Sequence, residues 1–428
     1  MKRIIALLLI AILAVGSVFT IKYQGSGYAF ADSASDEQAE ELYILDGQES
    51  EIGELPLSAL RFANQDMNKE IEWYFTPVEV KALSTMTLEQ KIGQLFIVRP
   101  ESFPGISGKL TSVTDALRKG MSERMPAGII MFGENIIDPD QIKTFNEDLH
   151  MAAYAYSTLP LLTAVDEEGG MVARIANNSN FSVQNFESML SIGNTGDTVQ
   201  AFKAGLAIGT YLKEYGFDLD LAPVADCFTN PDNKVIGDRS FGSDPELVSA
   251  MVGECIDGLH SRGIMASIKH YPGHGDTESD SHTGAVITKR SWDELKSREL
   301  IPFIDNMSKA DMIMTAHIVS AGVTGDDLPA TLSPVMINEK LRGELRYNGV
   351  VITDSMEMGA ISSEFSQEEA AIKAIEAGCD IILCPGNYAK AYDVVLEAVK
   401  SGRITEERID ESLLRIIRLK LKVSEEWT

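Results

Sequence analysis

One short segment of the chain concentrates the side chains that could do chemistry. Residues 269–282 (KHYPGHGDTESDSH) contain one Lys, three His and three acidic residues, with one Pro and two Gly among them. A protein core does not use this composition, because buried charges must be paired and because Gly and Pro interrupt regular structure. The apolar run 264–268 comes directly before, so the segment is predicted to be a loop that leaves the end of a strand, where functional residues usually lie. The alternative is a solvated loop without a chemical role.

Asp280 and His282 in this segment, and Asp354 further along, are the candidate catalytic residues. A carboxylate beside an imidazole favours its protonated form and fixes its tautomer, so His282 can give a proton to a leaving oxygen and then take one from water. Asp354 follows four β-branched residues, 350–353, and a carboxylate fixed at a strand end can attack an anomeric carbon. The alternative role of Asp354 is an N-cap for the next helix.

Other polar side chains supply donors that suit sugar hydroxyls, namely Arg174, Arg239, Lys269 and His270. Six of the eight expected strands end in or close beside a group of functional type, and these groups are Asp166 to Glu168, Asp226, Lys269 with His270, His317, Asp354 and Cys384. Any one of these acids could be a cap or a loop ion pair. Their convergence favours a single site.

The elements that must position these residues form a regular alternation. Eight apolar runs are predicted to be strands, the first of them together with the end of a helix: 92–98, 128–132, 161–165, 219–224, 264–268, 312–316, 350–353 and 380–383. Helical periodicity separates them, with capping-box starts at Thr87 and Ser291 and a last helix at 409–421. This pattern predicts an α/β fold, a TIM-like (β/α)8 barrel in one catalytic domain at 84–424, with its active site at the carboxyl ends of the strands.

The residues before the barrel divide into three parts. Lys2 and Arg3 precede the apolar run 4–21, and Ala29-Phe30-Ala31 resembles a cleavage site, so residues 1–31 are predicted to be a secretory signal, or alternatively a retained membrane anchor. Residues 32–54 are acidic and poor in apolar side chains, as in a disordered spacer. Residues 55–83 show no assignable pattern. We therefore expect a protein outside the cytoplasm, secreted or tethered at the outer face of the cytoplasmic membrane.

Composition narrows the partners. The chain has 37 basic and 64 acidic residues, a formal net charge of −27, which argues against nucleic acid because phosphate binding needs a basic surface. Its four cysteines are too scattered for a disulfide framework, and neither CxxC nor HExxH spacing occurs, so we expect no metal and no cofactor. The charge suits a protein that acts on a small neutral or sugar-like substrate, and we expect a monomer.

Five motifs give the chain a resemblance to glycoside hydrolase family 3. These are the segment at 269–282 with AVDEEGGMVAR (164–174), IGDRSFGSDPE (236–246), PATLS (329–333) and VITDSMEM (351–358). The likeness extends over about residues 86–421, and the His-containing segment is similar to the β-N-acetylglucosaminidase branch that trims cell-wall fragments.

The resemblance implies roles for individual residues. Asp354 would be the nucleophile of a retaining exo-glycosidase, and His282, oriented by Asp280, would be its general acid/base. The implied sugar ligands are Asp166, Arg174, Arg239, Lys269 and His270. The implied substrate is a peptidoglycan fragment (a muropeptide) with terminal β-linked N-acetylglucosamine.

The chain departs from the family pattern at Met171, where Arg is usual after the paired glycines; Arg174 is kept, so a neighbouring contact is expected to differ. Family β-glucosidases generally take their acid from a further C-terminal domain, which is not expected here, and this favours N-acetylglucosamine over glucose. The alternatives are another exo-β-glycosidase of the same fold, such as a β-glucosidase or β-xylosidase, and a catalytically silent barrel that binds wall glycans. The silent barrel would be marked by loss of Asp354 or His282, and both are present.

Overall fold

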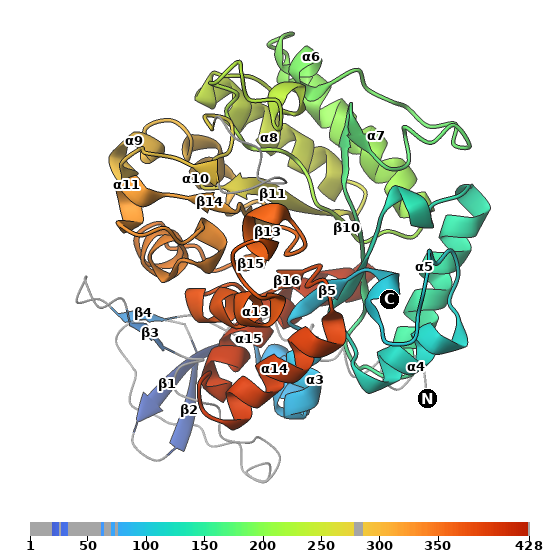
Figure 1. Ribbon diagram of the computed structural model, residues 1–428, viewed down its shortest axis with the longest axis vertical. Coiled ribbons are helices and arrows are strands. Elements are labelled where there is room, and N and C mark those ends of the chain that lie inside the picture. Colours follow the sequence, from blue (N-terminus) through green and yellow to red (C-terminus); the bar gives the residue numbers. More distant parts are fainter. Residues whose placement is uncertain are drawn as a thin grey trace.

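Eight short parallel strands form the centre of the molecule. The computed structural model describes residues 19–24, 27–32, 61–63, 70–72, 76–277 and 286–426. The eight strands are β5 (Phe96–Val98), β6 (Gly128–Met131), β7 (Leu162–Val165), β10 (Leu219–Asp220), β11 (Met265–Tyr271), β13 (Met312–Thr315), β15 (Val350–Thr353) and β16 (Ile382–Leu383). They are the eight strands predicted from the apolar runs, and in Figure 1 the helices surround them.

The sheet closes on itself. Its strand order is β15-β13-β11-β10-β7-β6-β5-β16. A parallel bridge between Ile352 and Ile381 joins its two ends, which makes the predicted barrel. β10 is shorter than the expected 219–224, because Pro223 has no N–H for the ladder, and beyond it a bridge between Val224 and Lys269 continues the pairing.

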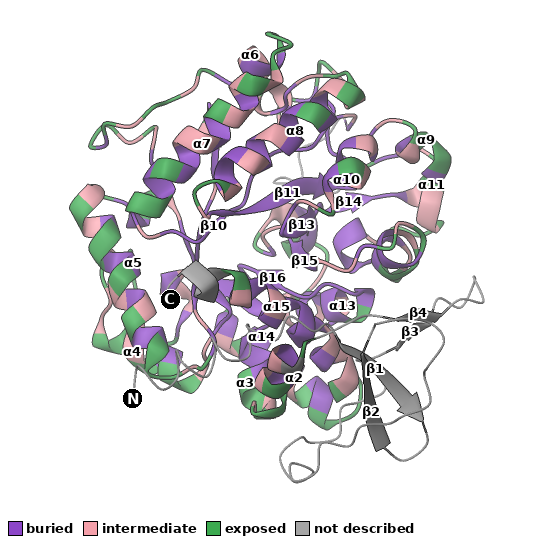
Figure 2. Cartoon of the chain, turned by 180° about the vertical axis from the view of Figure 1, so that it is seen from behind, coloured by how far each residue is buried: buried purple, intermediate pink, exposed green. Residues whose placement is uncertain are grey.

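Helices connect the strands around the outside of the barrel. Their bounds are α2 (Pro77–Ser84), α3 (Leu88–Gly93), α4 (Asp115–Glu123), α5 (Pro139–Tyr154), α6 (Met189–Gly193), α7 (Thr198–Glu214), α8 (Pro245–His260), α9 (Trp292–Lys296), α10 (Ile301–Asn306), α11 (Ala321–Thr324), α12 (Gly359–Ser362), α13 (Gln367–Ala377), α14 (Tyr388–Lys400) and α15 (Glu406–Glu426). Both predicted capping boxes are present, at Thr87 before α3 and at Ser291 before α9. Most helices turn a buried stripe toward the strands and an exposed one toward solvent (Figure 2).

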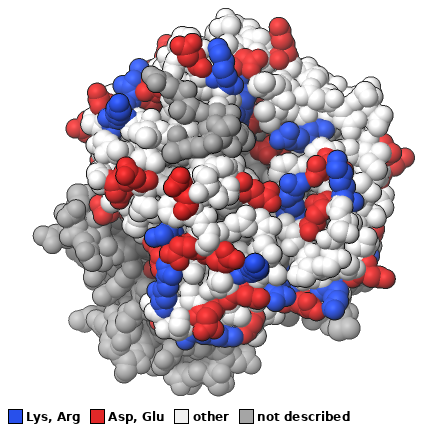
Figure 3. All heavy atoms as spheres, in the orientation of Figure 1, with Lys and Arg blue, Asp and Glu red and all other residues white. Residues whose placement is uncertain are grey.

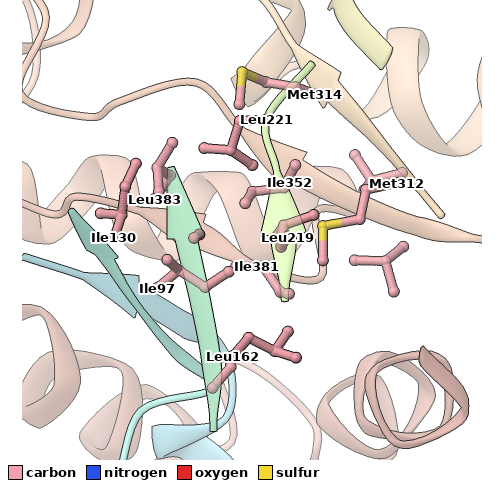
Figure 4. Packing of buried hydrophobic residues seen from close by; sticks show 14 of the residues in the cluster. Ile97, Ile130, Leu162, Leu219, Leu221, Met312, Met314, Ile352, Ile381 and Leu383 are labelled. Atoms are coloured by element: carbon pink, nitrogen blue, oxygen red, sulfur yellow. The ribbon is translucent and has the colours of Figure 1, made fainter. Parts of the chain in front are cut away.

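Side chains from all sides fill the barrel interior (Figure 4). Ile97, Leu162, Leu219 and Ile352 come from four different strands, and each is completely buried. Parallel strands covered by helices are apolar on both faces, which is why continuous apolar runs predicted them. The filled interior gives a rigid support for the loops at the strand ends.

Further short strands lie outside the barrel. β1 (Phe19–Gln24) pairs with β2 (Gly27–Asp32), and β3 (Arg61–Ala63) pairs with β4 (Glu70–Glu72), each antiparallel. The other two ribbons are β8 (Glu167–Gly169) with β9 (Val172–Ala173) and β12 (Val286–Ile287) with β14 (Ile318–Val319). The strands from β3 onward in this group have two or three residues each, too few to give a periodic pattern, so the sequence did not predict them. β1 and most of β2 fall within residues 1–31, which were predicted to be a signal.

Helix α2 lies before the predicted start of the barrel domain at residue 84, yet it packs against the barrel. Val80 and Leu83 are buried, and Glu79 pairs with Arg418 of α15 at 2.8 Å. Its capping box at Thr76 was readable in the sequence. The predicted signal core and the spacer lie almost wholly outside the described residues. No helix in the described ranges has the length and apolar character needed to cross a membrane.

Candidate active site

The carboxyl ends of the strands carry most of the predicted site residues, as expected for a barrel. Asp166 follows β7, and Lys269 and His270 lie at the end of β11. Arg239 ends a short helical turn, Gly237–Arg239, in the long loop after β10. Asp354 directly follows β15. Four of these five residues, all but Asp354, are joined by direct contacts or through one shared carboxylate.

Glu168 is the carboxylate that joins them. Its Oε1 lies 2.6 Å from Lys269 Nζ, while Arg239 donates two hydrogen bonds of 2.8 Å, one to each carboxylate oxygen. Lys269 Nζ also donates to Asp166 Oδ1 at 2.8 Å. Burial alone would raise the pKa of Glu168, but the charges of Arg239 and Lys269 lower it far below its usual value. Glu168 is therefore a fixed anion that holds two cations at the mouth of the barrel.

Asp226 contacts His270 and orients its ring. His270 Nδ1 lies 2.6 Å from Asp226 Oδ2, and the backbone N–H of His274 donates to Asp226 Oδ1 at 2.6 Å. The other ring nitrogen, Nε2, lies 3.3 Å from Arg239. Burial raises the pKa of Asp226, but its contacts with His270 and His274 more than offset this and lower it. Asp226 thus fixes the orientation of the imidazole, as a carboxylate partner of His commonly does.

Asp354, the predicted nucleophile, directly follows β15, and its carboxylate is held by the backbone. Its carboxylate accepts a 2.7 Å hydrogen bond from the Ser355 N–H, and the residue is half-buried. Burial raises the pKa of Asp354, but the charge of His317 and the Ser355 N–H outweigh it, so the pKa lies below its ordinary value. His317 is itself fixed, with Nε2 donating to the Ser355 carbonyl at 3.0 Å. Asp354 is thus an anion near neutral pH, as a nucleophile requires. It precedes Ser355 and α12 without capping that helix, whose N-cap is Met358.

Arg174 lies apart from this ionic cluster. Its guanidinium carbon is 5.8 Å from the centre of the Phe132 ring, and Arg99 stacks on the same ring at 4.6 Å. Its buried Nε has no hydrogen-bond partner within the described part of the chain. Met171, the departure from the family pattern, is 63% exposed. Arg174 therefore keeps donor capacity for a ligand.

Two predicted catalytic residues, Asp280 and His282, lie outside the described residues, so their roles stay predictions. Three residues that the candidate site set omitted now have clear positions, namely Glu168, Asp226 and His317. All three were noticed at strand ends, and that position was the signal that could have selected them.

The arrangement combines two half-buried carboxylates with a set of hydrogen-bond donors. Asp166 and Asp354 can accept from hydroxyls, and Lys269 and Arg239 can donate to them. Positive and negative side chains are mixed over the face that Figure 3 shows, although the whole chain is strongly acidic. Among the described residues, no group of three or more His, Cys, Asp or Glu is arranged to hold a metal ion. Such a set suits a neutral, hydroxyl-rich ligand.

Comparison with known proteins agrees with this geometry. The profile of the family "Glycosyl hydrolase family 3 N terminal domain" matches residues 87–419. The chain is 32% identical over 372 residues to beta-hexosaminidase A of Pseudoalteromonas piscicida, an alignment that covers 79% of this chain and 62% of that protein. It is 36% identical over 270 residues to a beta-hexosaminidase of Tolumonas auensis, covering 63% of this chain and 78% of the relative.

Solved structures give the same result. A glycoside hydrolase family 3 beta-N-acetylglucosaminidase from Paenibacillus sp. str. FPU-7 superposes with a TM-score of 0.74 at 38% identity, covering 80% of this chain and 63% of that one. A family 3 glycosyl hydrolase from Mycobacterium smegmatis superposes with a TM-score of 0.69 at 31% identity, covering 79% of this chain and 98% of that one. The chain thus spans less than two thirds of the Pseudoalteromonas and Paenibacillus proteins.

Proposed function

The chain belongs to glycosyl hydrolase family 3, and from this premise we propose that it is a retaining exo-β-N-acetylglucosaminidase. The observation that carries the proposal is the ionised, half-buried Asp354 at the end of β15, facing the same barrel mouth as Asp166, Lys269 and Arg239. The names of the relatives from Pseudoalteromonas and Paenibacillus support the choice of N-acetylhexosamine as the sugar.

In the first step Asp354 attacks the anomeric carbon. A bond forms between a carboxylate oxygen and C1 while the bond from C1 to the aglycone oxygen breaks. The imidazolium of His282 gives its proton to that oxygen, so the aglycone leaves as an alcohol. The product of this step is a covalent glycosyl-enzyme. The lowered pKa of Asp354 supports this step, because it favours the negatively charged carboxylate that the attack requires.

In the second step water releases the sugar. The neutral His282 takes a proton from water, whose oxygen bonds to C1 as the ester to Asp354 breaks. Two inversions at C1 give net retention of the β configuration. Asp280 orients the His282 ring and stabilises its charged form.

The ionic cluster binds the sugar. Asp166 offers an acceptor and Arg239 a donor within the cluster around Lys269 and Glu168, and His270 is held in a single orientation by Asp226. Directional hydrogen bonds of this kind fix the pyranose relative to Asp354, and correct positioning lowers the barrier to attack. Arg174 supplies a further donor.

The proposed natural substrate is a peptidoglycan fragment, hydrolysed outside the cytoplasm. This location follows from the basic start, the apolar run 4–21 and Ala29-Phe30-Ala31. Mature protein isolated from the native host should begin at or near Asp32. A membrane-bound form that retains residues 1–21 would support the anchor instead.

A panel of p-nitrophenyl β-glycosides tests the proposed sugar. The N-acetylglucosaminide should be cleaved much faster than the glucoside and the xyloside, and NMR of the first product should show the β anomer. Equal rates on the glucoside would favour the β-glucosidase alternative. A first product of α configuration would exclude the covalent mechanism, and binding of the glycosides without turnover would indicate a silent glycan-binding barrel.

A further inference from the structure

An ion pair joins the two sides of the segment that carries the predicted acid/base. Asp276 and Arg290 lie 14 residues apart, one on each side of residues 278–285. Arg290 donates from Nε to Asp276 Oδ2 at 2.6 Å and from its terminal nitrogen to Oδ1 at 2.9 Å. This two-point geometry fixes both the distance and the orientation of the partners.

The chain on the Asp276 side is anchored to the loop after β10. Asn233 donates to the His274 carbonyl at 2.7 Å, and Asn230 donates to the Thr277 carbonyl at 3.1 Å. Gly275 approaches this loop so closely that an added Cβ would lie 1.9 Å from the Cys227 carbonyl oxygen. Only glycine fits there, so the backbone is locked up to Thr277, directly before the segment.

The chain on the Arg290 side is anchored to the loop after β13. β12 pairs in parallel with β14 through Val286↔Ile318 and Ile287↔Val319. The Thr288 N–H then donates to the Val319 carbonyl at 2.9 Å. The two anchors belong to different barrel loops, and the Asp276–Arg290 pair is a direct link between them.

Neighbouring charges strengthen the link. Arg298 also donates to Asp276, at 3.2 Å, and the buried Glu299 pairs with both Arg298 and Arg290. The side chains of Asp276 and Arg290 are only 25% and 30% exposed. A partly buried two-point pair within a network is the kind of surface ion pair that can hold a geometry, whereas isolated exposed pairs contribute little.

We propose that Asp276 and Arg290 are positioning residues for the general acid/base, because their ion pair fixes the separation between the two ends of the segment that carries Asp280 and His282. The inference rests on the proposed function. Fixing the ends of a loop removes conformations from it, so less entropy is lost when a side chain on it must take one place. Neither residue touches the sugar; both act through His282.

The kinetic test compares leaving groups in Arg290→Met. Proton donation matters most for a poor leaving group, so kcat/KM on a β-linked N-acetylglucosamine disaccharide should fall about tenfold more than on the activated p-nitrophenyl glycoside. Arg290→Lys keeps the charge but loses the two-point geometry, so its ratio of kcat/KM should lie between those of the wild type and Arg290→Met. A purely structural role would lower kcat/KM by the same factor for both substrates, and that result would overturn the proposal.

A matched control is available at Arg403. This residue makes a comparable two-point pair with Glu369, at 2.9 and 3.1 Å, but between α13 and the turn after α14. Arg403→Met should leave the ratio between the two substrates unchanged. If Arg403→Met changed the ratio of kcat/KM between the two substrates, the ratio would report a general loss of rigidity, and the proposal would fail.

Hydrogen exchange gives a readout that does not depend on activity. The amides of Thr277 and Thr288 bond to the His274 and Val319 carbonyls, one at each anchor. Both should exchange faster in Arg290→Met than in the wild type or in Arg403→Met; unchanged exchange would overturn the proposal. Failure of the proposed function is recognised separately, because His282→Ala would then lower kcat/KM equally for both substrates. In that case there is no acid/base to position, and the inference fails with it.

Discussion

Carboxylates lie at both ends of the barrel, but they are satisfied to different degrees. At the amino end, three aspartates each come directly or one residue before a strand and accept the backbone N–H of a residue in the neighbouring strand. The pairs are Asp218 with Thr163, Asp311 with Ala266 and Asp380 with Val351. Each also has a cationic or imidazole partner. Among the residues that the structure describes, Asp218 has one, Asp311 has two, and Asp380 has two, Arg342 at 2.6 Å and Arg415 at 3.0 Å.

At the carboxyl end, Asp354 and Asp166 have fewer partners. Within the described residues, the carboxylate of Asp354 accepts from the Ser355 N–H and that of Asp166 from Lys269. Both residues are half-buried, whereas Asp380 is completely enclosed. The difference teaches that the same side chain stabilises the fold where several buried groups contact it, and remains able to bind or react where fewer do.

The largest expected effect is at the carboxyl end. Asp354→Asn keeps the size of the side chain but removes the charge that attacks C1, so kcat should fall about 10,000-fold or more. Circular dichroism should show an unchanged fold, because Asp354 makes few internal contacts. A mechanism-based fluorinated glycoside should label Asp354 in the wild type, as read by mass spectrometry. A label on Glu167 or Asp226 would mean that the nucleophile is wrongly assigned.

Asp380→Ala tests the amino end. Removing this carboxylate takes a buried counter-charge away from two buried guanidinium groups, so the free energy of unfolding should fall by about 3–5 kcal/mol. Urea unfolding measures the loss, and kcat per folded molecule should not change. Asp393→Ala, which removes an exposed partner of Arg124, is the control and should cost less than about 1 kcal/mol. A lower kcat in folded Asp380→Ala would contradict the assignment of stability to the amino end and of activity to the carboxyl end.

His282→Ala sharpens the carboxyl end further. Cleavage of a disaccharide should fall about 100-fold more than cleavage of an aryl glycoside, because only the poor leaving group needs a proton. Asp280→Ala should show the same pattern more weakly, since it removes the partner that orients the ring. An equal loss on both substrates, with reduced stability, would assign His282 a bracing role.

The smallest expected effect is a pH dependence at the amino end. Burial raises the pKa of Asp311, but the hydrogen bond from His260 and the charge of Lys422 lower it below its unfolded value. The stabilising contribution is therefore complete above about pH 4–5 and is lost as pH falls through the folded pKa. Wild type should exceed Asp311→Asn in unfolding free energy by about 2 kcal/mol at pH 7. Denaturant melts should show this gap narrowing toward pH 3; a constant gap would contradict the assigned charge.

The barrel strands could be predicted because each one is a continuous apolar run. The capping boxes at Thr87 and Ser291 could be predicted because capping is a local interaction. The ribbon of β8 with β9 could not, since its strands have three and two residues and turn through Gly169 and Gly170, both with positive φ. Glycine alone adopts that conformation without strain, so a pair of glycines indicates a turn. It does not indicate that two short paired strands flank the turn.

The site could be predicted residue by residue but not as a network. Asp166, Lys269 and His270 were predicted by type and strand position, and Arg239 by type alone. The role of Glu168 depends on Lys269 and Arg239 lying beside it in space, and Arg239 is 71 residues away along the chain. No local pattern carries that information. The same holds for Asp276 and Arg290, which lie in one loop whose two sides are anchored to different neighbouring loops.

The pairing of β5 with β16, the seam of the barrel, determines when the barrel can close during synthesis. Phe96 pairs with Ile382, and α15 covers the seam through ion pairs such as Lys91–Glu406, 315 residues apart. At translation rates of about 5–20 residues per second, β5 waits on the order of 15–60 s for its partner strand. Through that time its open edge is exposed to other chains, and contacts of such long range are slow to form. The pairing of β16 is therefore the step that ends the exposure of the first barrel strand.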